Sequence, residues 1–333
     1  MVSSVIYAAV PITVIVAVGF YRKWRSSKLS KCVSNTCLRG KTFLITGANS
    51  GIGFETAKAL VKRKARVIFA CRDINKAKEA ISIIRKEHNI GGELIPIQLD
   101  LASLESIEKF VEIVKAGFYK IDVLINNAGV VIPIEQDLKT KEGFEIHFGV
   151  NHLGPFYLTN LLLDLLKKAS PSRIVIVSST LHEKGKINFD DLNLRNEIES
   201  LKSGKAISNA RSQYSNTKLM NAYFMRALAA KLRDSGIDVN ACCPGFCYTN
   251  LFRYSIKWYH YILMLPIYFM FMRSAAEGAK TVEFVATDYR VEGKTGKFYR
   301  HCAEYNSKYP FDKEVETKLW NVTEDMIKAR KPI

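Results

Sequence analysis

The sequence predicts an α/β protein built as a single domain around a doubly wound parallel sheet. Short apolar runs alternate along the chain with segments in which apolar residues recur at helical spacing, as in strands joined by helices. The chain has 333 residues, of which 48% are hydrophobic, and can bury one large core. The expected strands are residues 43–45, 66–70, 93–98, 123–125, 173–177, 238–242 and 296–299.

The first apolar run ends in a glycine turn that opens directly into a helical pattern. The stretch from Lys41 to Gly53 reads Lys-Thr-Phe-Leu-Ile-Thr-Gly-Ala-Asn-Ser-Gly-Ile-Gly. Its glycines let the backbone approach a phosphate group, and the following helix points its first amide donors at the anion. An ordinary strand-to-helix turn is the alternative, but the strand before and the helix after weigh against it. The candidate cofactor contacts here are Gly47, Asn49, Ser50, Gly51, Ile52 and Gly53.

The N-terminal segment predicts a membrane anchor. Residues 1–21 contain no charged residue, and a helix of this length reaches roughly the 30 Å of a bilayer's hydrocarbon core. A cleaved signal peptide is the alternative, although no basic segment precedes the apolar run. Five basic residues and no acidic residue follow at 22–31, which by the positive-inside rule keeps the rest of the chain in the cytosol.

The charge and the cysteine content indicate which binding partners and which redox environment to expect. The net charge of +17 is spread along the chain, and no recognisable nucleic-acid-binding motif stands out. We therefore expect no nucleic acid partner and favour a basic surface near anionic lipid. The seven cysteines are odd in number and lack metal-ligand spacing, so we expect reduced thiols and no metal.

Several polar motifs are candidates for a functional site. Two lie within helical patterns, and the others follow the ends of expected strands. Tyr214 and Lys218 open a helical pattern that runs through residue 232, and residues four apart share one helix face. Asn151 lies inside a pattern at 143–166, where asparagine is a poor helix former and is either a tolerated surface residue or functional. The strand-end motifs are Asp100-Leu101, Asn126-Asn127-Ala128-Gly129, Ser178-Ser179-Thr180 and the run from Pro244 to Thr249.

Together these motifs resemble the short-chain dehydrogenase/reductase superfamily. The resemblance implies a Rossmann-type sheet and hydride transfer between a nicotinamide cofactor and a carbonyl or alcohol. It implies Tyr214 as the proton donor, with Lys218 lowering the pKa of the phenol. It places the substrate-side serine at Ser179, with Ser178 as the alternative, and it implies that Asn151 opens its helix locally and relays protons through water. The implied catalytic residues are Tyr214, Lys218, Ser179 and Asn151.

The same resemblance implies how the cofactor is held and favours NADP(H). NAD-preferring relatives usually end the second strand in an acidic residue, where this chain has Cys71 followed by Arg72. A guanidinium can pair with the 2′-phosphate of NADP in a fork. Asp73 is the competing ribose contact, but we expect it to cap the next helix. The further implied contacts are Asp100, Leu101, Asn127, Ala128, Gly129, Tyr214, Lys218, Pro244, Gly245 and Thr249.

A narrower resemblance, to the microsomal retinol dehydrogenase group, covers about nine tenths of the chain. It rests on Ala70-Cys71-Arg72-Asp73, Val150-Asn151-His152-Leu153-Gly154, Gly296-Lys297-Phe298-Tyr299 and Leu319-Trp320-Asn321-Val322. It implies a lipophilic aldehyde or alcohol such as retinal or retinol, and a single-pass protein of the endoplasmic reticulum membrane facing the cytosol. Steroid or other lipid-carbonyl reduction is the alternative, and a catalytically silent cofactor-binding scaffold is the alternative of another class.

The expected domain boundaries follow from these assignments. They are an anchor at 1–21, a basic linker at 22–39, the catalytic domain at 40–310 and a helical tail at 311–333. The polar stretch 188–211 is expected to be a loop insertion at the substrate mouth. The apolar stretch 254–272 is expected to be a lid that dips into the membrane interface, with membrane lipid as a second partner. An oligomer is possible.

Overall fold

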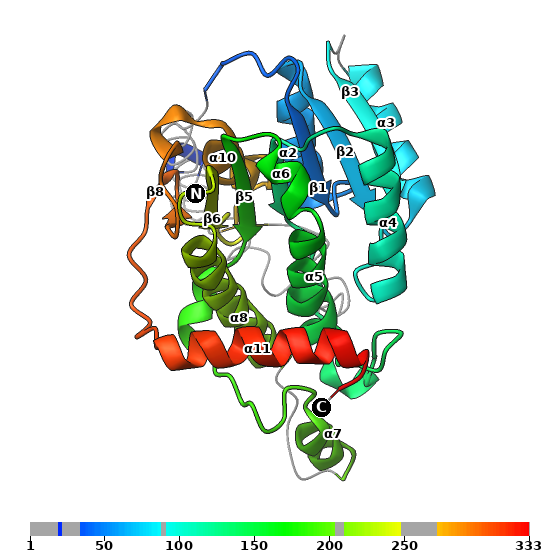
Figure 1. Ribbon diagram of the computed structural model, residues 1–333, viewed down its shortest axis with the longest axis vertical. Coiled ribbons are helices and arrows are strands. Elements are labelled where there is room, and N and C mark those ends of the chain that lie inside the picture. Colours follow the sequence, from blue (N-terminus) through cyan, green and yellow to red (C-terminus); the bar gives the residue numbers. More distant parts are fainter. Residues whose placement is uncertain (1–18, 22–33, 88–90, 204–209, 248–271, 333) are drawn as a thin grey trace, which may run out of the picture.

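The computed structural model describes residues 19–21, 34–87, 91–203, 210–247 and 272–332. Its strands form one sheet in the order β3-β2-β1-β4-β5-β6-β7-β8, parallel except for the pairing of β7 with β8 (Figure 1). The strands are β1 (Thr42–Thr46), β2 (Arg66–Cys71), β3 (Glu93–Gln98), β4 (Val123–Asn126), β5 (Ser172–Val177), β6 (Ile237–Cys243), β7 (Phe298–Arg300) and β8 (Ala303–Glu304). The predicted α/β class and parallel sheet are confirmed.

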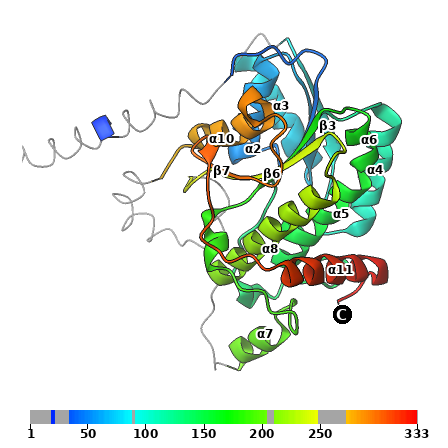
Figure 2. The ribbon, with the colours of Figure 1, turned by 60° about the vertical axis from the view of Figure 1, so that its left-hand side comes forward.

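Helices cover both faces of this sheet (Figure 2). One face carries α2 (Gly51–Lys62), α3 (Ile74–Glu87) and α10 (Ala275–Thr287). The other carries α4 (Leu104–Gly117), α5 (Gly154–Leu161), α6 (Leu163–Lys167) and α8 (Ala210–Lys231). The last described helix, α11 (Lys313–Ala329), lies across α8 and α5, and α7 (Arg195–Lys202) lies beyond it.

The strands are apolar on both sides because both faces are covered. In β1, Leu44 packs into the core beneath α4, α5 and α8, whereas Phe43 and Ile45 pack into the core beneath α2, α3 and α10. Alternate side chains of a strand point to opposite faces, so a continuous apolar run fills two cores at once. Each fully buried side chain of this kind contributes roughly 1.5–3 kcal/mol to the free energy of unfolding.

The sheet reverses its strand order beside β1, and this places the site. Chain connections run from β1 outward to β2 on one side, and later return to β4 on the other. In such a sheet a crevice opens at the carboxyl ends of the two strands at the switch point. The glycine turn after Thr46 and the asparagine motif at the end of β4 therefore meet at one edge.

Three predicted elements differ from the structure. The pattern at 143–166 is not one helix, because a π-helical turn (Phe148–Leu153) and a break at Leu162 divide it. The stretch 188–211 is not only loop, since α7 forms where Ile198 packs with Ile134 and Leu194. The terminal helix begins at Lys313, not at 319, because Asp312 caps it through the backbone N of Glu314 at 2.8 Å.

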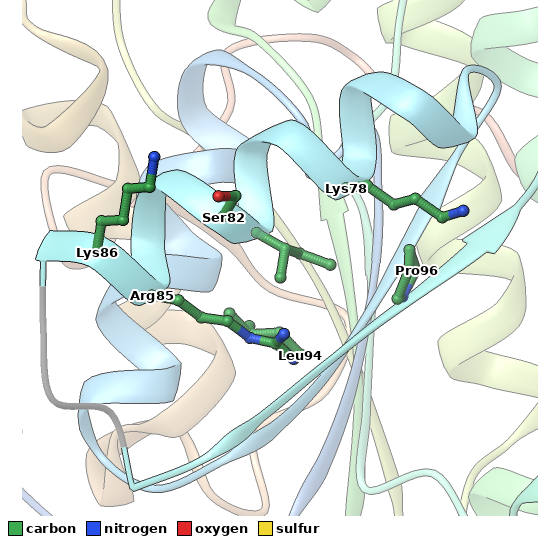
Figure 3. Close-up of a pocket in the computed structure, with 7 residues that line it drawn as sticks. Lys78, Ser82, Arg85, Lys86, Leu94 and Pro96 are labelled. Carbon is green, nitrogen blue, oxygen red and sulfur yellow. The ribbon is translucent and has the colours of Figure 1, made fainter.

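A surface cavity lies over the edge strand β3, away from the switch point. It has a volume of about 320 Å³ and is open to solvent between α3 and β3 (Figure 3). Two strands, β2 and β1, separate β3 from β4 in the sheet, so this cavity is not part of the crevice. Its lining residues include Lys78, Ser82, Arg85, Lys86, Leu94 and Pro96.

Some predictions fall on residues that the structure does not describe. Of the expected anchor only residues 19–21 are described, and of the expected lid at 254–272 only Met272 is described. Thr249 lies outside the described ranges. Within the described ranges, no helix combines the length and the apolar character that a membrane crossing requires.

Candidate active site

The glycine turn after β1 forms an open cradle at the start of α2. Gly47 and Gly51 have φ values of +67° and +58°, in the left-handed region that favours glycine. A Cβ at Gly53 would lie 2.5 Å from Nδ2 of Asn127 and 2.5 Å from the carbonyl oxygen of Gly47. Glycine is therefore required here, and the backbone is left bare at the N-terminus of the helix.

This cradle fits the pyrophosphate of a dinucleotide. Ser50 is the N-cap of α2, but its side chain makes no capping hydrogen bond to the first turn, and that turn contains no acidic residue. The first N–H groups of a helix have no acceptor within the helix, and its dipole favours an anion there. The residues present thus supply donors and no competing carboxylate.

Asn127 ties the end of β4 to the end of β1. Its backbone N donates to Oγ1 of Thr46 at 2.9 Å, and its Nδ2 donates to the carbonyl oxygen of Thr46 at 2.8 Å. The backbone N of Ala128 also donates to Oγ1 of Thr46, at 2.9 Å. One threonine hydroxyl therefore fixes the asparagine motif against the glycine turn. Thr46 is not among the residues predicted from sequence, although its place directly before Gly47 is a usable signal.

The residues after β2 and β3 line the same edge. Cys71 is buried, and burial raises the pKa of its thiol to about 11. Arg72 is exposed. Asp73 accepts hydrogen bonds from the backbone N of Asn75 and of Lys76 at 3.0 and 3.1 Å, so it caps α3 as expected. Asp100 accepts from the backbone N of Ala102 at 3.0 Å and begins the turn into α4.

Tyr214 and Lys218 lie side by side on α8, as the four-residue spacing predicts. Nζ of Lys218 is 5.2 Å from the centroid of the Tyr214 ring and donates to the carbonyl oxygen of Val177 at 2.9 Å. Both side chains are buried. Because burial disfavours charge, it raises the pKa of Tyr214 and lowers the pKa of Lys218 to about 8. The expected lowering of the Tyr214 pKa is thus wrong for the protein alone, because burial raises that pKa.

Asn151 lies in the π-helical turn, and its side chain extends toward Lys218. Its Oδ1 accepts from the backbone N of Val130 at 2.7 Å, and its Nδ2 donates to the carbonyl oxygen of Val130 at 3.0 Å. A Cβ at Gly129 would lie 3.3 Å from Oδ1 of Asn151 and 3.9 Å from Nζ of Lys218. Asn151 and Lys218 therefore meet across Gly129, and the helix is widened at Asn151 as the resemblance implied.

A second asparagine, Asn221, supports Asn151 from α8. Its Nδ2 donates to the backbone carbonyl oxygen of Asn151 at 2.9 Å. Asn221 lies seven residues after Tyr214 on the same helix, which places it two turns further along the same face. Asn221 is not among the residues predicted from sequence, and its spacing from Tyr214 is the signal that points to it.

The two serines after β5 face different neighbours. Ser178 is buried, and its Oγ donates to the backbone carbonyl oxygen of Lys218 at 3.1 Å. Ser179 is partly exposed, and its Oγ accepts from the backbone N of Leu181 at 3.2 Å. Ser178 therefore holds α8 to the sheet, and Ser179 is the serine that can reach a ligand.

The turn after β6 closes the crevice beside α10. Gly245 has a φ of +92° and packs against the side chain of Arg273. A Cβ at Gly278 would lie 2.5 Å from Sγ of Cys247 and 3.4 Å from both Ile52 and Pro244. The start of α2 and the Pro244 turn therefore meet beneath α10, which brings this predicted turn to the phosphate cradle.

A phosphate cradle at the switch point of a parallel sheet, beside a buried tyrosine and lysine pair, defines a nicotinamide-dependent oxidoreductase. The family model described as short chain dehydrogenase matches residues 41–190 and 198–260, and this chain belongs to that family. The predicted superfamily and enzyme class are thereby confirmed.

Individual relatives place the chain in the retinol dehydrogenase group. Retinol dehydrogenase 14 of Homo sapiens is 41% identical over an alignment 308 residues long, and the match covers 87% of each chain. Retinol dehydrogenase 12 of Mus musculus is 38% identical over 298 residues, which are 89% of each chain. The crystal structure of an uncharacterized protein from Mycobacterium paratuberculosis matches with a TM-score of 0.67 and 31% identity, covering 90% of this chain and 97% of that one.

Proposed function

We propose that this protein is a membrane-anchored reductase that uses NADPH to convert a lipophilic aldehyde, most specifically retinal, into its alcohol, with the reverse oxidation also available. The observation that carries the proposal is the meeting of Tyr214, Lys218, Asn151 and the serine motif at the end of β5, next to the phosphate cradle. The names of the relatives, retinol dehydrogenases 14 and 12, support the choice of retinal.

The side chains divide the work at the carbonyl group. A bound nicotinamide supplies the hydride. Tyr214 gives its phenolic proton to the substrate oxygen, and its raised pKa keeps that proton in place at neutral pH. Ser179 donates a hydrogen bond to the same oxygen and fixes the direction of the C=O bond. Lys218, charged below its pKa of about 8, stabilises the phenolate that remains until a proton returns.

Asn151 holds the loop after Gly129 and lies where a proton can return to Lys218. Its side-chain amide is occupied by both backbone groups of Val130 and by Oγ1 of Thr217, at 2.7 to 3.2 Å. We propose that the amide fixes the loop after Gly129 and that a water near the widened turn carries the proton to Lys218. This proton path refines the role that the resemblance implied.

The choice of NADP over NAD rests on the end of β2. Cys71 offers no carboxylate to accept from a ribose 2′-hydroxyl, and the carboxylate of Asp73 is used in capping α3. The exposed Arg72 is then the group that would pair with a 2′-phosphate. In cells the NADP pool is largely reduced, so the proposed direction is carbonyl to alcohol.

The proposal includes the domain organisation expected from sequence. It consists of an anchor at 1–21, a linker at 22–39, the catalytic domain at 40–310 and a tail at 311–333. The uncharged first segment and the basic run after it support attachment to the endoplasmic reticulum with the catalytic domain in the cytosol. The apolar stretch 254–272 supports a lid over a lipophilic substrate.

Turnover by membranes that carry the full chain tests the function. Retinal, decanal and a 3-ketosteroid would each be supplied with NADPH or NADH, and the Tyr214→Phe variant would serve as the blank. We expect retinal reduction with NADPH at the highest kcat/KM, and none above the blank with the variant. If only the steroid is turned over, the proposed substrate class becomes steroids in place of retinal. Binding of NADPH without turnover of any carbonyl would overturn the enzyme in favour of a silent scaffold.

A further inference from the structure

A buried histidine lies directly behind the serine motif. His182 belongs to the 3-10 helix η3 (Thr180–Lys184), and none of its surface is exposed. Its backbone N donates to the carbonyl oxygen of Ser179 at 3.0 Å, and its Nδ1 lies 2.6 Å from the same oxygen. Because a carbonyl oxygen can only accept, Nδ1 carries the ring proton. The carbonyl of Ser179 therefore accepts two hydrogen bonds from one residue.

The other ring nitrogen is held by a distant segment of the chain. Nε2 of His182 lies 2.7 Å from Oγ of Ser307. Burial lowers the pKa of His182, so the ring is neutral and Nε2 accepts the hydrogen of the serine hydroxyl. The ring packs between Phe298 and Phe311, with centroid distances of 4.7 and 6.2 Å. The carbonyl of Ser179 thus fixes the tautomer, and the contact with Ser307 holds the ring in the orientation in which Nδ1 reaches that carbonyl.

The segment that carries Ser307 has separate attachments to η3. Both the hydroxyl of Tyr305 and the backbone N of Lys308 donate to Oε1 of Glu183 at 2.9 Å. These bonds hold residues 305–308 against η3 without touching Ser179. The side chain of Ser307 also hydrogen-bonds to the carboxylate of Glu183, so Glu183 helps to hold the serine that orients His182.

The backbone of Ser179 decides where its hydroxyl points. The Oγ atom accepts from the backbone N of Leu181 at 3.2 Å, which makes Ser179 the N-cap of η3. A hydroxyl that accepts in this way still has its own hydrogen to donate. Any movement of the Ser179 backbone carries that hydrogen away from the substrate oxygen.

We propose that His182 is a positioning residue for Ser179, and that Ser307 orients its ring for this task. The inference rests on the proposed function, in which Ser179 binds the carbonyl oxygen of the substrate. It adds a residue pair that reaches the site through the serine's backbone and never touches the substrate.

Two substitutions of His182 separate its two hydrogen bonds. In His182→Asn the amide nitrogen takes the place of Nδ1 and can still donate to the carbonyl of Ser179. In His182→Gln the amide oxygen takes the place of Nε2 and can still accept from Ser307. With NADPH and decanal as probes, we expect His182→Asn to keep kcat within about threefold of wild type, and His182→Gln to lower it by about 10 to 100-fold, since small misplacements can cost about 100-fold. NADPH affinity should be unchanged in both, because neither touches the cradle.

The outcomes separate this inference from the function on which it rests. If Ser179→Ala is as active as wild type, the proposed role of the serine fails. If Ser179→Ala is inactive while His182→Asn and His182→Gln have equal kcat, only the positioning role fails. A measurement without turnover is ¹⁵N NMR of the histidine rings in the full chain. It should show His182 protonated at Nδ1, and protonation at Nε2 in the wild type would overturn the inference by itself.

Discussion

Nζ of Lys218 donates to the backbone carbonyl of Val177, the last residue of β5, at 2.9 Å. This hydrogen bond holds the ammonium at the carboxyl end of the strand that leads into the serine motif. Among the described residues, the carbonyl of Val177 is the hydrogen-bond partner of this nitrogen. This one bond offsets only part of the free-energy cost of burying the ammonium charge. Burial consequently lowers the pKa of Lys218 to about 8.

We predict that kcat/KM for carbonyl reduction falls as the pH rises through about 8. Above that pH Lys218 loses its charge, whereas Tyr214, whose pKa burial raises, keeps its proton. A pH profile of NADPH-dependent reduction measures this. Lys218→Arg is the comparison, since a guanidinium stays charged, and any activity it retains should not fall near pH 8. A wild-type profile flat to pH 10 would contradict the assignment.

The same pKa predicts how stability changes with pH. A buried lysine with a lowered pKa releases its proton in the folded state while the unfolded chain still binds one, so stability rises with pH between about 8 and the unfolded value near 10.4. The slope is at most about 1.4 kcal/mol per pH unit. Urea unfolding of wild type and Lys218→Met across this range isolates the effect. The stability of wild type relative to the variant should increase with pH, and a constant difference would argue against the lowered pKa.

Tyr214→Phe should abolish reduction and leave NADPH binding nearly intact. The change removes one hydroxyl from a buried ring and leaves the cradle at Gly47 to Gly53 untouched. General acid catalysis typically contributes about 10² to 10⁴-fold, so kcat should fall to below about a tenth of wild type. Single-turnover rates measure the loss of reduction, and NADPH titration measures cofactor binding. A variant that keeps more than about a tenth of the wild-type kcat would show that Tyr214 is not the proton donor.

Arg72→Ala should weaken NADPH binding far more than NADH binding. Only NADPH carries the 2′-phosphate, and a charge-assisted pair is worth roughly 1.5–3 kcal/mol, or about 10 to 150-fold in affinity. Arg72→Lys keeps the positive charge but not the forked guanidinium. Its affinity for NADPH should lie between those of wild type and Arg72→Ala. Fluorescence titration with each cofactor gives the ratio. An equal loss for both cofactors, or a wild type that prefers NADH, would contradict the NADP assignment.

The sequence predicted the strands well because their signal is local. A strand buried on both faces must be apolar throughout, and the runs at 43–45 and 173–177 are recognisable without a partner. The capping role of Asp73 was predictable for the same reason, since a cap bonds residues only two and three positions away. The Tyr214 and Lys218 pair also follows from local helix geometry.

What the sequence could not provide depends on distant contacts. α7 is polar along most of its length and forms where Ile198 meets Ile134, some sixty residues away in the chain. The pKa of Tyr214 depends on how deeply α8 is buried, which no spacing reveals. His182 gave no signal on its own, because its partner Ser307 lies 125 residues further along the chain.

The proposed anchor leads to a prediction about lipid binding. Deleting residues 1–21 removes the span but leaves the basic run at 22–31 and the apolar stretch at 254–272. Each basic residue near an anionic surface adds roughly 1 kcal/mol to binding, and salt screens this attraction within about 10 Å at 0.1 M. We therefore expect the shortened protein to float with anionic liposomes at low salt and to detach in part at high salt. The part that salt does not remove is assigned to 254–272.

Polar substitutions separate these two contributions in the shortened protein. Leu263→Ser with Phe269→Ser should abolish the salt-resistant fraction, whereas neutralising all five basic residues at 22–31 should abolish the salt-sensitive one. Flotation with neutral liposomes is the control, because only the apolar contribution should survive there. If the shortened protein stays wholly soluble at low salt with anionic lipid, neither segment binds the surface, and residues 254–272 serve the substrate alone.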